Sequence, residues 1–334
     1  MMSQLPEVVQ ALLDPGVYPD TSQGVEMAQT QMSFVFLTGD YVYKVKKPVN
    51  LGYLDYSTLE NRYFFCQREV ELNRRLCPDT YLGVVPITRN RGEIQLEGRG
   101  EVIDYAVKMR YLPQELMMNV LLANNQVTAL MVTSVAQRLA EFHQQAETNA
   151  TISAFGELET IIENTEENFS QTVKYIGNTI SQENYRHIKA YAKGFIDNDA
   201  YLFSKRMAEG KIRDCHGDLH AAHICFTDDI CIYDCIEFND RFRYCDVASE
   251  IAFLAMDLDH YGRADLSRSF IGAYIDYSQD EELSRLLSFY KCYRACVRGK
   301  VESFKLDDPH ISEEEKTKVQ AVAKKYFVLA ESYI

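Results

Sequence analysis

The stretch CHGDLHAAHICF, residues 215–226, brings together side chains that bind metals or move protons. His216, Asp218, His220 and His223 lie within eight positions of one another. Two interpretations are open. The spacing H-x-D-x-H-x-x-H offers borderline ligands to zinc or iron, as in a metal-dependent hydrolase. Alternatively, the stretch carries one catalytic aspartate whose partners lie elsewhere in the chain, and the rest of the sequence must decide between the two.

A second carboxylate follows sixteen residues after Asp218. Asp234 comes directly after the apolar run ICIY, and HICFTDDICIYDCIEF alternates apolar and polar residues around Asp228-Asp229, as a short hairpin does. Such a hairpin would bring both carboxylates to one edge. A pair of this kind suits phosphoryl transfer, in which one carboxylate accepts the hydroxyl proton and the other holds the magnesium that bridges the nucleotide phosphates.

The first third of the chain predicts a small sheet with one helix. QMSFVFLTGDYVYKVKKPV (31–49) contains two β-rich runs around the turn Thr38-Gly39-Asp40, and Lys44 and Lys46 project from one face of the second run. Residues 57–76 predict one helix that opens with a cap from Ser57 to Glu60 and ends before Pro78. Further strands are expected in YLGVVPITRN, EIQLEG and VIDYAVKMRYL.

After Pro113 the pattern changes to long helical periods. We therefore expect an N-terminal lobe over 1–112 and a helical C-terminal lobe over 113–334. Arg294, Arg298 and Lys300 recur on one predicted helix; a solvated face is favoured there over an anionic substrate pocket.

Composition narrows the classes of partner and location. The formal charge of −14 over 334 residues argues against broad binding to nucleic-acid phosphates. No stretch approaches 18 to 20 uncharged apolar residues, and the N-terminus has no basic start before an apolar run, which predicts a cytoplasmic protein without a membrane span. The nine cysteines form no CxxC pair, so buried reduced thiols are expected, including Cys215, Cys225, Cys231, Cys235 and Cys245.

Several of these segments resemble the aminoglycoside phosphotransferase and choline kinase group. The resemblance lies in HGDLHAAH, IYD, RYCDVASEIAFLA, VYKVKKP, QREVELNRRL, AVKMRYLP and QRLAEFH, and the overlap with the group extends over nearly the whole chain. FLTGDYVYKVKKP and CIEFNDRFRYCDVASEIAFLAMDL are more closely similar to uncharacterised bacterial aminoglycoside phosphotransferase-like proteins. Some members of that subfamily add a P-loop kinase domain, and the lack of GxxxxGK[ST] predicts that this chain has no such domain.

The resemblance implies an α+β, protein-kinase-like fold of two lobes, with ATP and Mg²⁺ as cofactors. It also implies that acceptor specificity lies in the variable helical insert, roughly 147–210, and in the C-terminal helices. It also implies a role for each matching residue. These are Asp218 as catalytic base; His216 and Asp246 as supports of the catalytic loop; Asp234 as metal ligand; Lys44 at the nucleotide phosphates, with Glu69 as its ion-pair partner; and main-chain groups around Met109 to Leu112, Tyr111 included, at the adenine. Lys46 and Glu71 remain the alternatives to Lys44 and Glu69, and Glu237, Asn239 and Asp240 are loop residues that could contact substrate.

One position departs from the group. His223 stands where the group has an asparagine that binds a second metal, and imidazole suits Mn²⁺ or Zn²⁺ better than Mg²⁺. The expected function is transfer of the γ-phosphoryl group of ATP to a hydroxyl of a small molecule. A nucleotide-binding pseudokinase with a regulatory role is the alternative. The hydrolase remains a third candidate, although it leaves the strand lysine, the helix glutamate and Asp246 unexplained.

Overall fold

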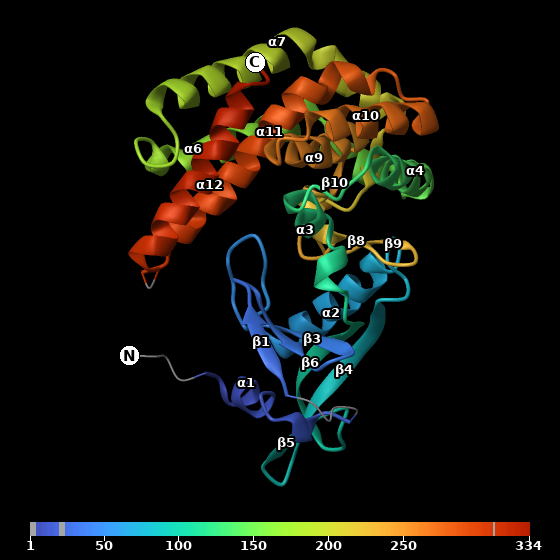
Figure 1. The fold of residues 1–334 in the computed structure, drawn as a ribbon, viewed down its shortest axis with the longest axis vertical. Coiled ribbons are helices and arrows are strands. Elements are labelled where there is room, and N and C mark those ends of the chain that lie inside the picture. Colours follow the sequence, from blue (N-terminus) through green and yellow to red (C-terminus); the bar gives the residue numbers. More distant parts are fainter. Residues whose placement is uncertain (1–4, 20–23, 310) are drawn as a thin grey trace. The chain divides into compact units, whose positions relative to one another are not determined.

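The computed structural model describes residues 5–19, 24–309 and 311–334, which form two compact units. The first unit consists of residues 1–117 and 223–240, and the second of residues 118–222 and 241–334 (Figure 1). The division expected at residue 113 remains a prediction about domains. The compact units differ from it because the short hairpin after His223 groups with the N-terminal sheet.

The N-terminal unit is built on an antiparallel six-stranded sheet of order β1-β2-β3-β6-β4-β5. Its elements are α1 (Glu7–Ala11), β1 (Glu26–Gln29), β2 (Ser33–Leu37), β3 (Tyr41–Lys46), α2 (Leu59–Asn73), β4 (Tyr81–Asn90), β5 (Glu93–Leu96), β6 (Glu101–Arg110), β8 (Ile224–Phe226) and β9 (Ile230–Ile232). The expected hairpin at Thr38–Asp40 joins β2 to β3, where Gly39 has φ of 85° and the Thr38 amide donates to Tyr41 O. The second expected hairpin is also present as β8 and β9.

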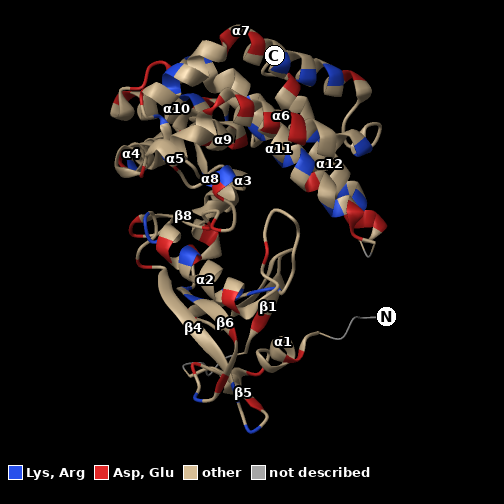
Figure 2. Cartoon of the chain, turned by 180° about the vertical axis from the view of Figure 1, so that it is seen from behind, with Lys and Arg blue, Asp and Glu red and all other residues tan. Residues whose placement is uncertain are grey.

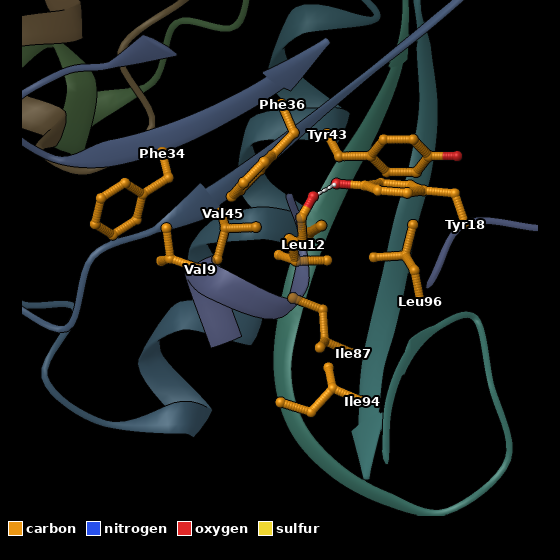
Figure 3. Close-up of a cluster of buried hydrophobic side chains, with 11 residues drawn as sticks. Val9, Leu12, Tyr18, Phe34, Phe36, Tyr43, Val45, Ile87, Ile94 and Leu96 are labelled. Atoms are coloured by element: carbon orange, nitrogen blue, oxygen red, sulfur yellow. Dashed lines mark hydrogen bonds between the residues drawn. The ribbon is translucent and has the colours of Figure 1, made fainter. Parts of the chain in front are cut away.

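The two faces of the sheet have different coverings because side chains alternate along each strand. On β3, Tyr43 and Val45 join the apolar cluster that packs against Val9 and Leu12, while the Tyr18 hydroxyl donates to Leu12 O at 2.6 Å (Figure 3). The other face packs against α2 through a second cluster, which consists of Cys66, Val70, Tyr81 and Val107. Lys44 and Lys46 alternate with Tyr43 and Val45, so both lysines point toward α2.

Helix α2 begins one residue later than its sequence signal suggests. The Thr58 hydroxyl, not that of Ser57, accepts from the Asn61 amide at 3.1 Å and caps the helix. Ser57 instead donates its hydroxyl to Asp55. The prediction of Ser57 as the cap is therefore wrong, because two adjacent hydroxyl residues fit the same cap signal and a local turn takes the first of them.

The C-terminal unit is helical apart from one short β-ladder between β7 (Ile212–Asp214) and β10 (Tyr244–Asp246). Its helices are α3 (Met118–Ala123), α4 (Ala129–Gln145), α5 (Ala150–Ser153), α6 (Leu158–Thr172), α7 (Gln182–Ala208), α9 (Val247–His260), α10 (Ala264–Ser278), α11 (Leu283–Phe304) and α12 (Glu313–Glu331); the short α8 (Asp240–Arg243) crosses the division between the units. Residues 247–258 of α9 are all buried, so this helix forms the centre of the unit. In contrast, α12 exposes both signs of charge (Figure 2).

Among the described cysteines, Cys77 and Cys231 form a disulfide, with Cα atoms 4.7 Å apart. The expectation of a reduced thiol at Cys231 is therefore wrong. The two residues are 154 positions apart, and they meet because α2 ends beside β9 in the N-terminal unit. The other thiols named above, Cys215, Cys225, Cys235 and Cys245, are free, and all but Cys245 are buried.

Two helical glycines allow a matched test of packing in the C-terminal unit. A Cβ added at Gly299 in α11 would lie 2.8 Å from the ring of Phe327, whereas one at Gly272 in α10 would meet nothing within 4 Å. We expect Gly299→Ala to lower the free energy of unfolding by about 1 to 3 kcal/mol through overpacking. Gly272→Ala should raise it by about 0.5 to 1 kcal/mol through helix propensity. Urea unfolding of both variants checks this, and equal effects would contradict the close packing of α11 on α12.

Candidate functional site

In the N-terminal unit, β3 and α2 place two lysines on one buried carboxylate. Lys44 Nζ lies 2.8 Å from Glu69 Oε1, and Lys46 Nζ lies 2.7 Å from Glu69 Oε2. The ion pair expected between Lys44 and Glu69 is thus present in the structure, together with a second lysine. Glu69 is fully buried on the face of α2 that packs on the sheet. A carboxylate in such a place requires charged partners, and β3 supplies two of them from alternate positions.

Asp234 joins this cluster through Lys44. It follows β9, and its Oδ1 accepts a hydrogen bond from Lys44 Nζ at 2.7 Å. The Asp234 amide donates to the Tyr81 hydroxyl at 3.2 Å, and the backbone has φ of 63°. Aspartate tolerates this left-handed conformation better than most residues, and here it sets the direction of the side chain. The Asp234 side chain is 41% exposed, so an oxygen ligand suited to Mg²⁺ remains accessible.

The pKa values of the cluster follow from burial and charge acting in opposite directions. Burial alone would lower the pKa of Lys44, but the carboxylates of Asp234 and Glu69 raise it well above its usual value. For Glu69, burial favours the neutral form, yet the two lysines outweigh this and lower its pKa. Lys44 and Glu69 therefore both remain ionised at neutral pH.

A third carboxylate in the same unit belongs to the segment after Asp234. Glu237 Oε1 accepts from Lys46 Nζ and, at 2.6 Å, from the Tyr56 hydroxyl. Glu237 is 8% exposed. Glu237 is expected from the sequence only as a loop residue that could contact substrate, and Lys46 only as the alternative to Lys44. A glutamate flanked by Ile236 and Phe238 was the available signal, because a charge between apolar residues on a short segment is often buried with a partner.

His223, the residue that departs from the group, also lies in this unit. Its Nε2 is 3.5 Å from Asp234 Oδ2, and its ring contacts that of Tyr233. The imidazole thus faces the carboxylate expected to hold a metal. Met109 and Tyr111, expected at the adenine, lie at the end of β6 and just beyond it. The amides of Arg110 and Tyr111 donate to Thr80 O and Asp40 O, so these two amides are already used within the unit. The adenine contact stays a prediction for the other main-chain groups of residues 109–112.

The catalytic segment predicted around Asp218 lies in the C-terminal unit. Gly217 has φ of 89°, a conformation that glycine adopts readily, and this turn directs the Asp218 side chain outward with 34% of it exposed. His216 is 1% exposed, and its Nδ1 accepts from the Asp218 amide at 3.3 Å. His216 therefore lies inside the loop, and its role as a support stays a prediction.

Glu250, on the first turn of α9, holds the backbone of this segment. Its Oε1 accepts from the amides of His216 at 2.8 Å and Gly217 at 2.7 Å. His143 Nε2 lies 2.7 Å from Glu250 Oε2, and His143 Nδ1 lies 2.8 Å from the Tyr274 hydroxyl. Burial would raise the pKa of Glu250, but the His143 hydrogen bond, together with the charges and amides around it, lowers this pKa to about 2.

The role expected for Asp246 is wrong. Its carboxylate binds the buried Arg206 at 2.7 Å and caps α9 through the Ala248 amide, and the loop carboxylate is Glu250, four residues further on. Asp246 and Glu250 both lie at the start of α9, where either fits an acid ahead of an apolar helix. Position decides between them: Asp246 ends a β-ladder and points to α7, whereas Glu250 lies one turn into the helix and faces the loop.

The basic residues of α11 do not form a solvated face. Arg294 is 7% exposed and donates to Gly217 O and Ser249, and Arg298 Nη1 lies 3.3 Å from His220 Nε2. Lys300 donates to Asn168 Oδ1 at 2.5 Å. The favoured expectation of a solvated helix face is wrong for these residues, since two arginines support the catalytic segment from behind.

Two residues of the hydrolase candidate lie close together in the C-terminal unit, since His220 Nε2 is 3.6 Å from Asp218 Oδ2. Among the described residues of that unit, His143, Cys215 and Glu250 have ligand atoms within 4.8 Å of one another. All three are buried, and Glu250 uses both oxygens for the hydrogen bonds described above. His216 is likewise turned into its own loop. These contacts describe a hydrogen-bonded core.

Comparison with known structures identifies the fold. A choline/ethanolamine kinase family protein from Mesorhizobium loti aligns over 97% of this chain and 99% of its own, with 11% identity and a TM-score of 0.51. An amicoumacin kinase aligns over 96% and 92%, with 11% identity and a TM-score of 0.51. A putative aminoglycoside phosphotransferase from Ralstonia eutropha aligns over 98% of both chains, with 10% identity and a TM-score of 0.50. The chain has the fold of these small-molecule kinases.

The sequence relatives of the chain are proteins whose names give no activity. Uncharacterized proteins of Mycobacterium bovis and Mycobacterium tuberculosis are 35% identical over 279 residues, which is 83% of this chain. The chain spans 54% of the length of these relatives. No family model matches the sequence. Among the described residues, none of the helices has the length and apolar character needed to cross a membrane. The kinase-like α+β fold expected from the sequence is confirmed.

Replacing Glu250 tests the support of the catalytic segment. Glu250→Gln removes a charge that accepts two backbone amides, so we expect the free energy of unfolding at pH 7 to fall by about 2 to 3 kcal/mol. Because the folded pKa is lowered to about 2, the charge stabilises the wild type above its unfolded pKa of about 4.3 and loses this effect as pH falls toward 2.

The difference between wild type and Glu250→Gln should therefore be full at pH 6 and shrink below pH 4. Urea unfolding between pH 2.5 and 7 measures it. Glu159→Gln, on the exposed first turn of α6, is the matched control and should differ little from wild type at any pH. A loss of stability for Glu250→Gln that does not depend on pH would contradict the charged role.

Proposed function

We propose that this chain is an ATP-dependent phosphotransferase that transfers the γ-phosphoryl group to a hydroxyl of a small molecule. The observation that carries the proposal is the set Lys44, Glu69 and Asp234, which joins a strand lysine, a helix glutamate and an accessible carboxylate through ion pairs in one unit. A purely structural ion-pair network has no need to leave a carboxylate exposed. The fold shared with small-molecule kinases supports the same conclusion.

The residues fit a nucleotide and a divalent cation. Asp234 offers hard oxygen ligands to Mg²⁺, and Lys44 is an ammonium group able to contact phosphate oxygens. When bound, ATP supplies the phosphoryl group and the metal neutralises its charge. The amicoumacin kinase that shares the fold was solved with AMP-PNP and Ca²⁺, which supports nucleotide and metal use for the fold in general.

Asp218 supplies the second part of the proposal. Its partly exposed carboxylate would orient the acceptor hydroxyl and accept its proton, while Glu250 and Arg294 keep the Gly217 turn in place from the buried side. Several proteins that share the fold act on small molecules such as ethanolamine and amicoumacin by their names. The acceptor of this chain is proposed only as a hydroxyl compound of that size.

A regulatory pseudokinase is the second candidate, and the position of His223 favours it. An imidazole 3.5 Å from Asp234 Oδ2 competes for the carboxylate when protonated and favours softer metals when neutral. Under this alternative the chain binds nucleotide without turnover. The two candidates share the nucleotide site and differ in the chemistry that follows.

Nucleotide binding tests both candidates. Calorimetry with ATP alone, with Mg²⁺ and with Mn²⁺ should show metal-dependent binding by the wild type. Asp234→Asn should abolish the metal dependence because it removes the charged oxygen ligand. His223→Asn should strengthen binding with Mg²⁺ relative to Mn²⁺, since an amide oxygen is a harder ligand. Absence of ATP binding by the wild type under every condition would refute both candidates.

Turnover separates the kinase from the pseudokinase. In a screen of hydroxyl compounds that follows ADP release, the wild type should turn over at least one acceptor class. Asp218→Asn should reduce the rate by about 100-fold or more while the affinity for ATP stays within a few-fold, because the carboxylate acts on the hydroxyl and not on the nucleotide. Full activity in Asp218→Asn would remove that residue from the mechanism.

A further inference from the structure

Lys44 and Lys46 hold Glu69 in different ways. Lys46 Nζ donates a hydrogen bond to Glu69 Oε2 at 2.7 Å. Lys44 Nζ lies 2.8 Å from Glu69 Oε1 and also donates to Asp234 Oδ1 at 2.7 Å. Lys44 therefore joins Glu69 to a partly exposed carboxylate, whereas the hydrogen bond from Lys46 to Glu69 is enclosed.

Lys46 also reaches the segment that follows Asp234. Its Nζ donates to Glu237 Oε1, which accepts a second hydrogen bond from the Tyr56 hydroxyl. The ammonium group lies 4.7 Å from the centre of the Tyr56 ring. Glu237 is three residues beyond Asp234, so one lysine on β3 links helix α2 to the segment that carries the proposed metal ligand.

Burial separates the two lysines further. The Lys46 side chain is 0% exposed, whereas that of Lys44 is 16% exposed and touches the partly exposed Asp234. A fully enclosed ammonium group cannot contact a ligand that arrives from solvent. Both carboxylates bound by Lys46, Glu69 and Glu237, are themselves buried, so none of these three charges is open to solvent.

We propose that Lys46 is a positioning residue that keeps Glu69 and the Asp234–Glu237 segment in place independently of Lys44; this inference rests on the proposed function. With Lys44 alone, movement of its ammonium group toward phosphates would leave the buried Glu69 without a cation, which is strongly unfavourable. Lys46 removes that obstacle because it retains its hydrogen bond to Glu69. Lys44 is then free to exchange its carboxylate partners for a ligand.

The test replaces Lys46 and Glu237 together, so that neither is left as an unpaired buried charge. Lys46→Met with Glu237→Gln makes both positions neutral, so folding should be largely retained, and the thermal midpoint confirms this. Glu69 nevertheless loses its hydrogen bond. Lys47→Met, one position along, is the control, since Lys47 binds Gln29 and Thr30 O at the surface. Two readouts are compared: calorimetry with ADP and Mg²⁺, and hydrogen exchange of the nucleotide-free proteins by mass spectrometry.

The proposal predicts faster exchange at 66–73 and 233–238 in the double variant, and affinity for ADP with Mg²⁺ weaker by about 10- to 100-fold. The control should match wild type in both measurements. Unchanged exchange in both segments would overturn the proposal, even if the wild type bound no nucleotide. Faster exchange with wild-type affinity would also overturn it, because Lys46 would then stabilise the fold without positioning the site. A wild type that fails to bind ADP refutes the proposed function, and exchange alone then decides whether Lys46 holds the two segments.

Discussion

The buried carboxylate of Glu69 is the constraint around which the N-terminal unit is arranged. A charge removed from water at this depth is tolerated only with partners of opposite sign and defined geometry. Strand β3 meets that need because its two lysines lie on the face toward α2, while the residues between them complete the apolar cluster on the other face. Each lysine then recruits a second carboxylate from the segment after β9. The result is a network of five alternating charges, of which the Asp234 side chain is the most exposed. In order of contact they are Asp234, Lys44, Glu69, Lys46 and Glu237.

The C-terminal unit also contains a buried glutamate, Glu250, but its partners are backbone amides and a histidine instead of lysines. Its catalytic segment needs a backbone turn at Gly217 whose amides point inward, and Glu250 accepts them from within the most buried helix of the unit. His143 and Tyr274 continue the hydrogen bonds behind Glu250, so the segment rests on a core of satisfied polar groups. In both units a buried glutamate fixes the backbone or the cation, and each unit also has an aspartate with a partly exposed side chain, Asp234 in the first and Asp218 in the second.

The sequence predicts the elements well where one local pattern determines them. The hairpins at Thr38–Asp40 and Asp228–Asp229 follow from alternation and turn residues, and the structure has both. A local pattern does not decide between two neighbouring residues of the same type. Nothing local separates Lys44 from Lys46, because both lie on one face of β3, and only the depth of α2 over that face decides which becomes enclosed.

The same limit explains the other errors. Asp246 and Glu250 both precede apolar positions of α9, but Asp246 is the N-cap of the helix, whereas Glu250 lies one turn further on and accepts the loop amides. The pairing of Cys77 with Cys231 depends on the end of α2 meeting β9 across 154 residues, which no spacing rule encodes. Long-range packing assigns these roles, whereas sequence patterns supply the candidates.

The charges of the N-terminal cluster bear on how the site can change state. Two ammonium groups face three carboxylates, and Lys44 is shared between Glu69 and Asp234. A partner is easiest to give up where water can replace it, and Asp234 is the most exposed carboxylate of the set. Glu69 is fully buried, so water cannot replace Lys44 as its partner. The cation that remains with Glu69 must therefore be a residue of the protein. The enclosed Lys46 is thus what allows Lys44 to be mobile, and the pair serves as one fixed and one exchangeable cation.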